Sequence, residues 1–137
     1  MSRDEDPIRI VPPGWNPEVS EQFGYSFGVK RGATLWVAGQ VAIDDAGRPV
    51  DVDDVSAQTK RVLERIRAIV ETAGGTMTDV VKTTTYITDR AHRPITNELR
   101  RRYWPGPHYP TNTLLVVAGL ALPEFLVEIE AVAVIGR

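Results

Sequence analysis

The sequence predicts an α+β fold, in which two helices pack on one face of a single mixed β-sheet. Strand-like and helix-like segments follow one another in the order strand, strand, strand, helix, strand, helix, strand, strand. Runs of strands with only two helices indicate a sheet that is covered on one side. The chain of 137 residues has the size of one domain and leaves no further element for the other side. We therefore expect association through the uncovered sheet face.

The first part of the chain predicts three strands. The expected elements are a disordered start (1–7), a short edge strand (8–11), a loop (15–24) and the two strands of a hairpin (25–30 and 34–43). Gly39 lies inside the last of these strands. A glycine at such a position indicates a bulge, or the close approach of another backbone or of a ligand.

The clearest helix begins near Asp51 or Asp53, either of which is an expected N-cap, and ends before Gly74-Gly75. Apolar residues recur at helical spacing from Val55 to Ala73. The opposite face is expected to meet solvent. It carries Lys60, Arg61, Glu64, Arg65, Arg67 and Glu71.

The second part of the chain predicts three more strands and a weaker helix. They are a β-branched strand (80–88), a helix with Pro94 in its first turn (94–103), a proline-rich loop (105–110), a strand (113–117) and a final strand (125–135). The final strand is nearly continuous apolar sequence, which is typical of a strand buried on both faces.

Two carboxylates, Glu128 and Glu130, interrupt this final strand. Successive strand residues point to opposite faces, so both are expected to share a face with Val132 and Val134. A carboxylate in apolar surroundings is a candidate general acid or base. The alternative is that this face is solvated and that both are ordinary surface residues.

Composition narrows the classes of function. The net charge of −2 favours neither nucleic acid nor a membrane surface as a partner, and no apolar run reaches the length of a membrane span. The absence of cysteine and of a signal peptide fits a cytoplasmic protein. The basic run Arg100–Trp104 resembles a nucleic-acid patch, but the acidic balance favours a solvated helix face with aromatic packing.

No metal-binding, phosphate-binding or nucleophile motif occurs in the sequence, so no metal or other cofactor is expected. The remaining polar candidates suit acid–base work on a bound water or a tautomerising substrate better than covalent catalysis. They are Tyr25, Gln40, Asn97, Asn112 and Glu128.

Several motifs, in register from about Gly24 to Val134, make the chain similar to the Rid family (reactive intermediate deaminases, also called YjgF). They are Gly24-Tyr25-Ser26, Trp36–Val41, Gln58-Thr59 through Ala73-Gly74, Val80–Asp89 and Val127–Ala133. The resemblance implies a chorismate-mutase-like fold and a homotrimer with a central barrel of sheets. It also implies that a small-molecule ligand binds between subunits. The implied reaction is hydrolysis of an imine or enamine to a carbonyl compound and ammonia, without a cofactor.

The resemblance also assigns roles to residues. Glu128 matches the glutamate that positions or activates the attacking water, and Tyr25 matches the pocket tyrosine. Gly39 matches a glycine whose backbone lines the pocket, and Asn97 matches the asparagine of the second helix.

The chain departs from the family where an arginine normally grips the substrate carboxylate, because Asn112 occupies that position. A neutral amide cannot form the bidentate, charge-assisted pair. We therefore expect a substrate other than the usual small 2-imino acids. His108 and Arg102 are candidate replacements for the lost cation.

Two neighbours of Asn112 are also candidate ligand-binding residues. Thr113 offers a backbone group for developing charge, and Leu114 is expected to reshape the cleft. An alternative function is a non-catalytic trimer that binds a metabolite or a protein. RNA cleavage, attached to some members of the family, is disfavoured by the acidic balance.

Overall fold

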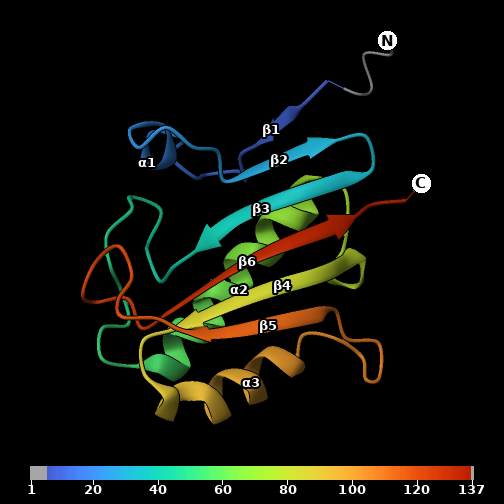
Figure 1. The fold of residues 1–137 in the computed structure, drawn as a ribbon. Coiled ribbons are helices and arrows are strands. Elements are labelled where there is room, and N and C mark those ends of the chain that lie inside the picture. The colour runs from blue at the N-terminus through green and yellow to red at the C-terminus, as the bar shows by residue number, and fades with distance from the viewer. Residues whose placement is uncertain (1–5, 137) are drawn as a thin grey trace.

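The structure is a computed structural model that describes residues 6–136. Six strands form one sheet in the order β1-β2-β3-β6-β4-β5 (Figure 1). Their bounds are β1 (Ile8–Ile10), β2 (Gly28–Arg31), β3 (Thr34–Gln40), β4 (Val80–Ile87), β5 (Thr111–Val116) and β6 (Val127–Val134). The β4–β5 pair is parallel and the other neighbours are antiparallel, so the predicted mixed sheet is confirmed.

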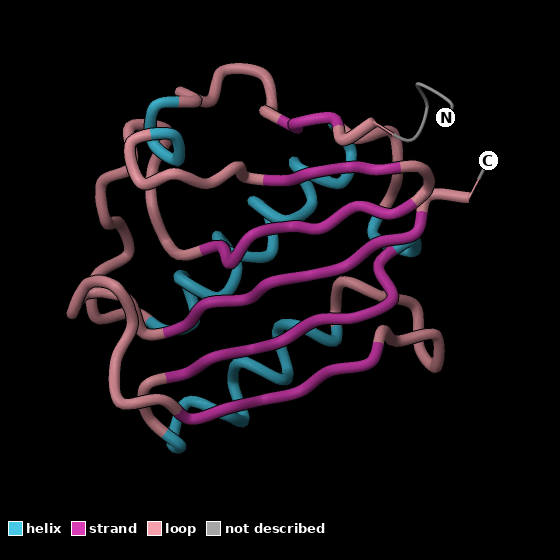
Figure 2. Tube along the Cα trace, turned by 45° about the horizontal axis from the view of Figure 1, so that its top comes forward, coloured by secondary structure: helices cyan, strands magenta, loops and turns pink. Residues whose placement is uncertain are grey.

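The helices are α1 (Glu18–Glu21), α2 (Val55–Thr72) and α3 (Arg93–Arg101), with short 3₁₀ turns at Met77–Asp79 and Arg90–His92. Figure 2 shows α2 and α3 behind the same face of the sheet, as predicted. The longer helix, α2, packs against the central strands β3 and β6 and against α3. No helix within residues 6–136 has the length and apolar character needed to cross a membrane.

The core lies between the sheet and α2. Residues of β6 alternate, with the odd positions buried toward the helices and the even positions half-buried or exposed on the other face. We expected β6 to be buried on both faces. Within a single chain, only the face that carries the odd-numbered residues is buried. The fully buried core side chains include Leu35, Leu63, Ile66, Ile69, Ile87, Ile129 and Val127.

Some expected features of the first part of the chain are wrong. The loop expected at 15–24 contains the short helix α1, and the strand expected from Tyr25 begins only at Gly28. The N-cap of α2 is Asp54, whose carboxylate accepts the Ala57 N–H at 2.9 Å. The predicted disorder of residues 1–7 falls largely outside the described residues.

Other differences are shifts of element ends. The third strand stops at Gln40, because the register shifts between Val37 and Gln40. This irregularity is the bulge that Gly39 predicted. In the second part, α3 ends two residues earlier than expected, and β5 begins at Thr111 rather than at Thr113.

Arg65 is the largest correction on α2. It was expected on the solvent face, yet it is 7% exposed. Its Nε donates to Gln40 Oε1 at 3.1 Å, and its guanidinium stacks 3.9 Å from the ring centroid of Trp15. Burial lowers the pKa of Arg65 to about 10. Because Trp15 lies in a segment remote in sequence, helical periodicity alone could not place this residue.

Candidate functional site

Glu128 and Glu130 lie on the same face of β6, as predicted, and this is the face of the sheet that carries no helix. The Tyr86 hydroxyl donates to Glu130 Oε1 at 2.6 Å. Glu128 is half-buried and has no hydrogen-bond partner among residues 6–136. Burial, followed by the negative charge of Glu130, raises the pKa of the Glu128 carboxyl. This environment favours an acid–base role over that of an ordinary surface residue.

Gly39 lies directly beside the Glu128 carboxyl group. A Cβ atom at position 39 would lie 2.8 Å from Cδ of Glu128, closer than two carbon atoms can pack. The glycine is therefore required by the space that this carboxyl group occupies. The bulge in β3 brings its backbone to that place.

Tyr25 lies in the loop before β2 and is 43% exposed. Its ring meets the ring of Phe27 edge-on, with centroids 6.5 Å apart. Partial burial raises the pKa of Tyr25, while Arg65 lowers it and Glu128 raises it. The phenol is therefore a neutral hydrogen-bond donor at physiological pH, within electrostatic reach of Glu128.

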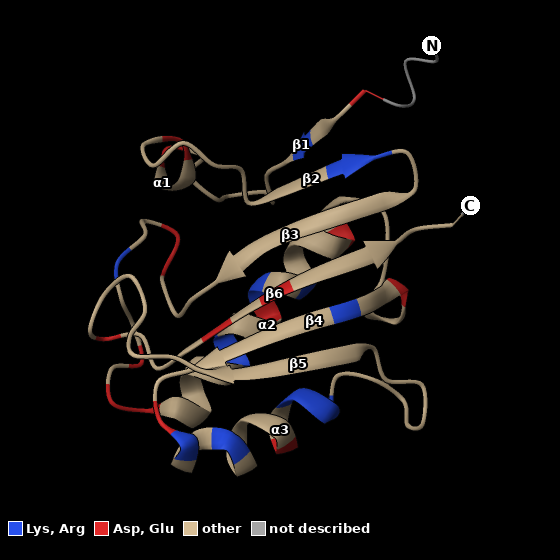
Figure 3. Cartoon of the chain, in the orientation of Figure 1, with Lys and Arg blue, Asp and Glu red and all other residues tan. Residues whose placement is uncertain are grey.

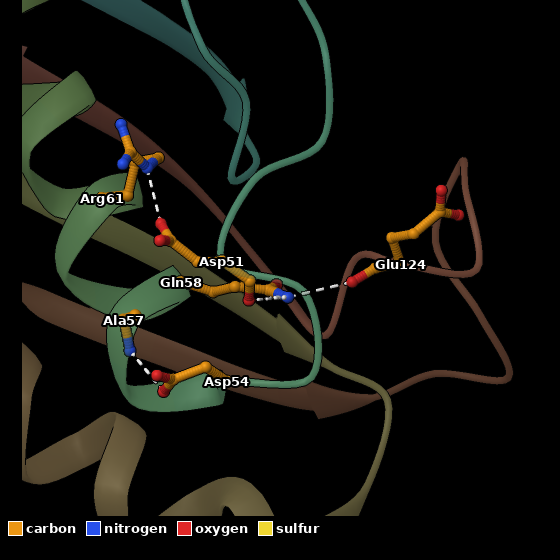
Figure 4. Close-up of polar contacts among 6 residues, drawn as sticks. All are labelled: Asp51, Asp54, Ala57, Gln58, Arg61 and Glu124. Atoms are coloured by element: carbon orange, nitrogen blue, oxygen red, sulfur yellow. Dashed lines mark hydrogen bonds and ion pairs between the residues drawn. The ribbon is translucent and has the colours of Figure 1, made fainter.

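A buried amide fixes the start of β6 (Figure 4). Gln58 of α2 donates through Nε2 to the Glu124 carbonyl at 2.9 Å and to the Asp51 carbonyl at 3.2 Å. Its Oε1 accepts the Leu126 N–H at 2.9 Å. These bonds hold the chain just before Glu128 against the helix. A single glutamine in an amphipathic pattern gave no sign of this role.

A second group of predicted residues lines a groove of about 850 Å³ between α3 and β5. It contains Asn97, Asn112 and Leu114. Asn112 Oδ1 accepts hydrogen bonds from the hydroxyls of Thr83 at 2.9 Å and Thr85 at 3.0 Å. These bonds hold the Asn112 side chain on the helix-covered side of the sheet.

The two groups point to opposite faces of the sheet. On β4, Tyr86 pairs with Glu128 and Thr83 pairs with Asn112. Thr83 and Tyr86 are separated by an odd number of positions, so their side chains, and those of their partners, lie on opposite faces of the sheet. Strand β4 separates them. Thr113, which pairs with Thr84, shares the face of Glu128. One chain therefore does not bring all the predicted residues into one pocket.

The two candidate replacements for the lost arginine do not line the groove. Arg102 is paired with Glu98 at 3.3 Å, and His108 is exposed in the loop before β5. Four other arginines line it instead: Arg90, Arg93, Arg100 and Arg101. We did not predict from the sequence that they line a groove, and we expected Arg100 and Arg101 on a solvated helix face, although Arg93, Asn97 and Arg100 are spaced to share one helix face.

The basic and aromatic run 100–104 agrees in part with the expected packing. Trp104 is buried, and its Nε1 donates to the Met77 carbonyl at 2.6 Å. Tyr103 donates to Glu64 of α2 at 2.7 Å. Arg100, by contrast, is half-buried rather than solvated. The described residues hold no group of three or more His, Cys, Asp and Glu side chains suited to a metal ion.

Comparisons with known proteins agree with this architecture. The family model described as endoribonuclease L-PSP matches residues 17–135. A crystal structure of a protein of unknown function of the conserved Rid family from Yersinia pestis is 28% identical, with a TM-score of 0.81, covering 94% of this chain and 99% of that one.

Two further solved structures are similar. A member of the highly conserved YjgF/YER057c/UK114 family from Mycobacterium tuberculosis is 32% identical, with a TM-score of 0.79 and coverage of 94% and 99%. The YjgF gene product of E. coli is 28% identical, with a TM-score of 0.80, covering 93% of this chain and 98% of that one.

Proposed function

The chain belongs to the endoribonuclease L-PSP family, also known as the Rid or YjgF family, and from that premise we propose that it hydrolyses an imine or enamine to a carbonyl compound and ammonia. The observation that carries the proposal is the Glu128 carboxyl group. It is half-buried, it has a raised pKa, and it occupies space that only a glycine at position 39 leaves free.

In this reaction Glu128 accepts a proton from water as the water oxygen bonds to the imine carbon. Delivery of this proton to the imine nitrogen gives a carbinolamine, which carries the hydroxyl and the amine on one carbon. A second proton then passes from that hydroxyl through Glu128 to the nitrogen, so that the C=O bond forms as the C–N bond breaks and ammonia leaves. Tyr25 donates a hydrogen bond to the substrate, and backbone groups near Gly39 and Thr113 stabilise the developing charge.

We further propose that the complete site forms between subunits of a homotrimer. The opposite orientations of Glu128 and Asn112 support this arrangement. A neighbouring subunit would place its groove residues Asn97, Asn112 and Leu114 against the Glu128 face. The bound ligand is then a small molecule at the subunit boundary.

The second candidate is a non-catalytic trimer that binds a metabolite or a protein. Asn112 favours it, because this neutral amide stands where the family has a carboxylate-binding arginine. The two functions differ in one measurable respect, since only the first releases ammonia.

The test is ammonia release from imines generated in situ by amino-acid oxidases. We expect Glu128→Gln to lose turnover by at least about 100-fold, in the range of a lost general base. Glu71→Gln, an exposed change on α2, serves as the matched control and is expected to keep full activity.

The pH profile gives a second readout. Because burial raises the pKa of Glu128 above its ordinary value, the ionised base is lost as pH falls through that raised pKa. Wild-type turnover is therefore expected to decline on that acidic limb. Unchanged turnover in Glu128→Gln would contradict the proposed role, and ligand binding without turnover in wild type would favour the second candidate.

A further inference from the structure

The groove between α3 and β5 is strongly basic in an acidic protein. Four arginines line it, and none of its lining residues is acidic, whereas the whole chain has a net charge of −2. Figure 3 shows the basic segments along α3 beside the edge strand β5. A concave surface of one charge sign attracts ligands of the opposite sign.

Arg100 is the most unusual of these cations. Its Nε and Nη1 atoms are shielded from solvent and have no hydrogen-bond partner among residues 6–136. Burial lowers the pKa of this guanidinium. Because the Arg100 guanidinium lines the groove and has no acceptor among residues 6–136, a carboxylate bound in the groove would give this half-buried cation a partner.

Other cations lie at the rim of the groove. Arg93 and Arg90 are exposed and form no ion pair within the described residues, whereas Arg101 bonds the Tyr109 hydroxyl at 3.4 Å and approaches Glu98. Arg93 and Arg100 are two helical turns apart, about 10.5 Å along the axis. Their long side chains can converge on the two ends of one small molecule.

We propose that this groove binds a small dianion, so that the substrate class is the imine of a dicarboxylic amino acid. The planar guanidinium of Arg100 donates hydrogen bonds to one carboxylate. Arg93, together with Arg90, attracts the second carboxylate. Related proteins carry an arginine at the position of Asn112. In this chain the arginines of α3, on the other side of the groove, supply that positive charge. The imine part rests on the proposed function, whereas the binding of a dianion does not.

A small molecule fits these features better than RNA does. Single-stranded RNA is usually held by several stacking aromatic side chains along an extended basic track. The groove contains one aromatic residue, Tyr109, and the rest of the protein is net acidic. The single half-buried guanidinium of Arg100 is suited to one compact anionic group.

Calorimetric titration with 2-oxo acids tests the binding without requiring turnover. We expect 2-oxoglutarate, a dianion, to bind at least about tenfold more tightly than pyruvate, a monoanion, because it engages a second cation. Arg100→Met is expected to remove that preference, and Arg100→Lys is expected to weaken it without removing it. Arg102→Met, outside the groove, is the matched control and should behave as wild type.

Thermal unfolding of each variant establishes that it is folded, and Arg93→Met provides an independent test at the rim. Equal affinity for the two acids, or a preference that survives both Arg100→Met and Arg93→Met, would overturn the proposal. It would equally be overturned if a short RNA oligonucleotide, and neither acid, bound in an Arg100-dependent way.

A separate assay distinguishes this inference from the proposed function. Imines of alanine and glutamate are generated by the matching oxidases, and ammonia release is followed with each. We expect faster hydrolysis of the glutamate imine. Binding of 2-oxoglutarate without hydrolysis of either imine would reject the deaminase function and retain the dianion site.

Discussion

At the residue scale, the position of the Glu128 carboxyl group depends on the absence of a side chain at Gly39. Gly39 has no Cβ atom, and the space that a Cβ would fill holds the carboxyl group of Glu128. The neighbouring carboxylate, Glu130, is bonded to Tyr86, so it is fixed while Glu128 has no hydrogen-bond partner in residues 6–136. Of the two carboxylates, Glu128 is thus the one able to engage a water or a substrate.

Gly39→Ala should therefore impair turnover with little effect on folding. The new methyl group displaces the flexible carboxyl end of Glu128, and misplacement of a reacting group by about 1 Å can cost 100-fold in rate. The measurement is ammonia release beside thermal unfolding. Gly119→Ala, at a site with open space, is the matched control. Wild-type turnover in Gly39→Ala would show that the carboxyl position is not critical.

At the element scale, strong periodic patterns predicted most of the fold. The final strand and α2 were identified because alternation and helical spacing report directly on burial. The errors arise where the geometry of a turn, or a contact with a segment remote in sequence, determines the structure. Asp54 caps α2 because Asp51 and Asp53 adopt positive φ values of 56° and 64° in the preceding turn. No spacing rule distinguishes among three nearby aspartates.

The bonds of Gln58 lead to a stability prediction for the element that carries Glu128. Gln58→Leu leaves the carbonyls of Asp51 and Glu124 and the Leu126 N–H without their partners. Unsatisfied buried groups typically cost about 1–3 kcal/mol each, so we expect a loss of about 2 kcal/mol or more. Urea unfolding measures this loss. Hydrogen exchange should also increase in residues 120–126.

Lys60→Ala is the control for that change, since this exposed residue lies on the same helix and forms no side-chain hydrogen bond or ion pair within residues 6–136. It should alter the free energy of unfolding by no more than about 0.5 kcal/mol. If Gln58→Leu were as stable as Lys60→Ala, the loop before β6 would have to be held by other contacts.

At the scale of the whole molecule, the sheet face that carries Glu128 is also rich in exposed apolar groups. Trp36, Leu115 and Val134 are 49%, 43% and 43% exposed on that face. Such a surface suits association. The sequence indicated the candidate site residues through a family resemblance, yet their division between two faces depends on strand register. Which residues of β5 and β6 share a face follows from the pairing of both strands with β4, and this pairing joins segments far apart in the sequence.

Mixing two inactive variants tests whether neighbouring subunits share the site. Glu128→Gln removes one half of a proposed site and Asn112→Ala alters the other half, so each variant alone should be inactive or strongly impaired. After the two are mixed, unfolded and refolded together, some boundaries join an intact Glu128 face to an intact Asn112 groove. For random assembly of a cyclic trimer we expect about a quarter of the sites to be intact.

Ammonia release by the mixture should then recover to about a quarter of the wild-type rate for these randomly assembled trimers. Mass measurement by light scattering checks the trimer itself. A site contained in one chain predicts no recovery, because every chain in the mixture carries one defect. Recovery therefore requires that Glu128 of one chain and Asn112 of a neighbouring chain together form a site. The opposite orientations of Glu128 and Asn112 lead us to expect that result.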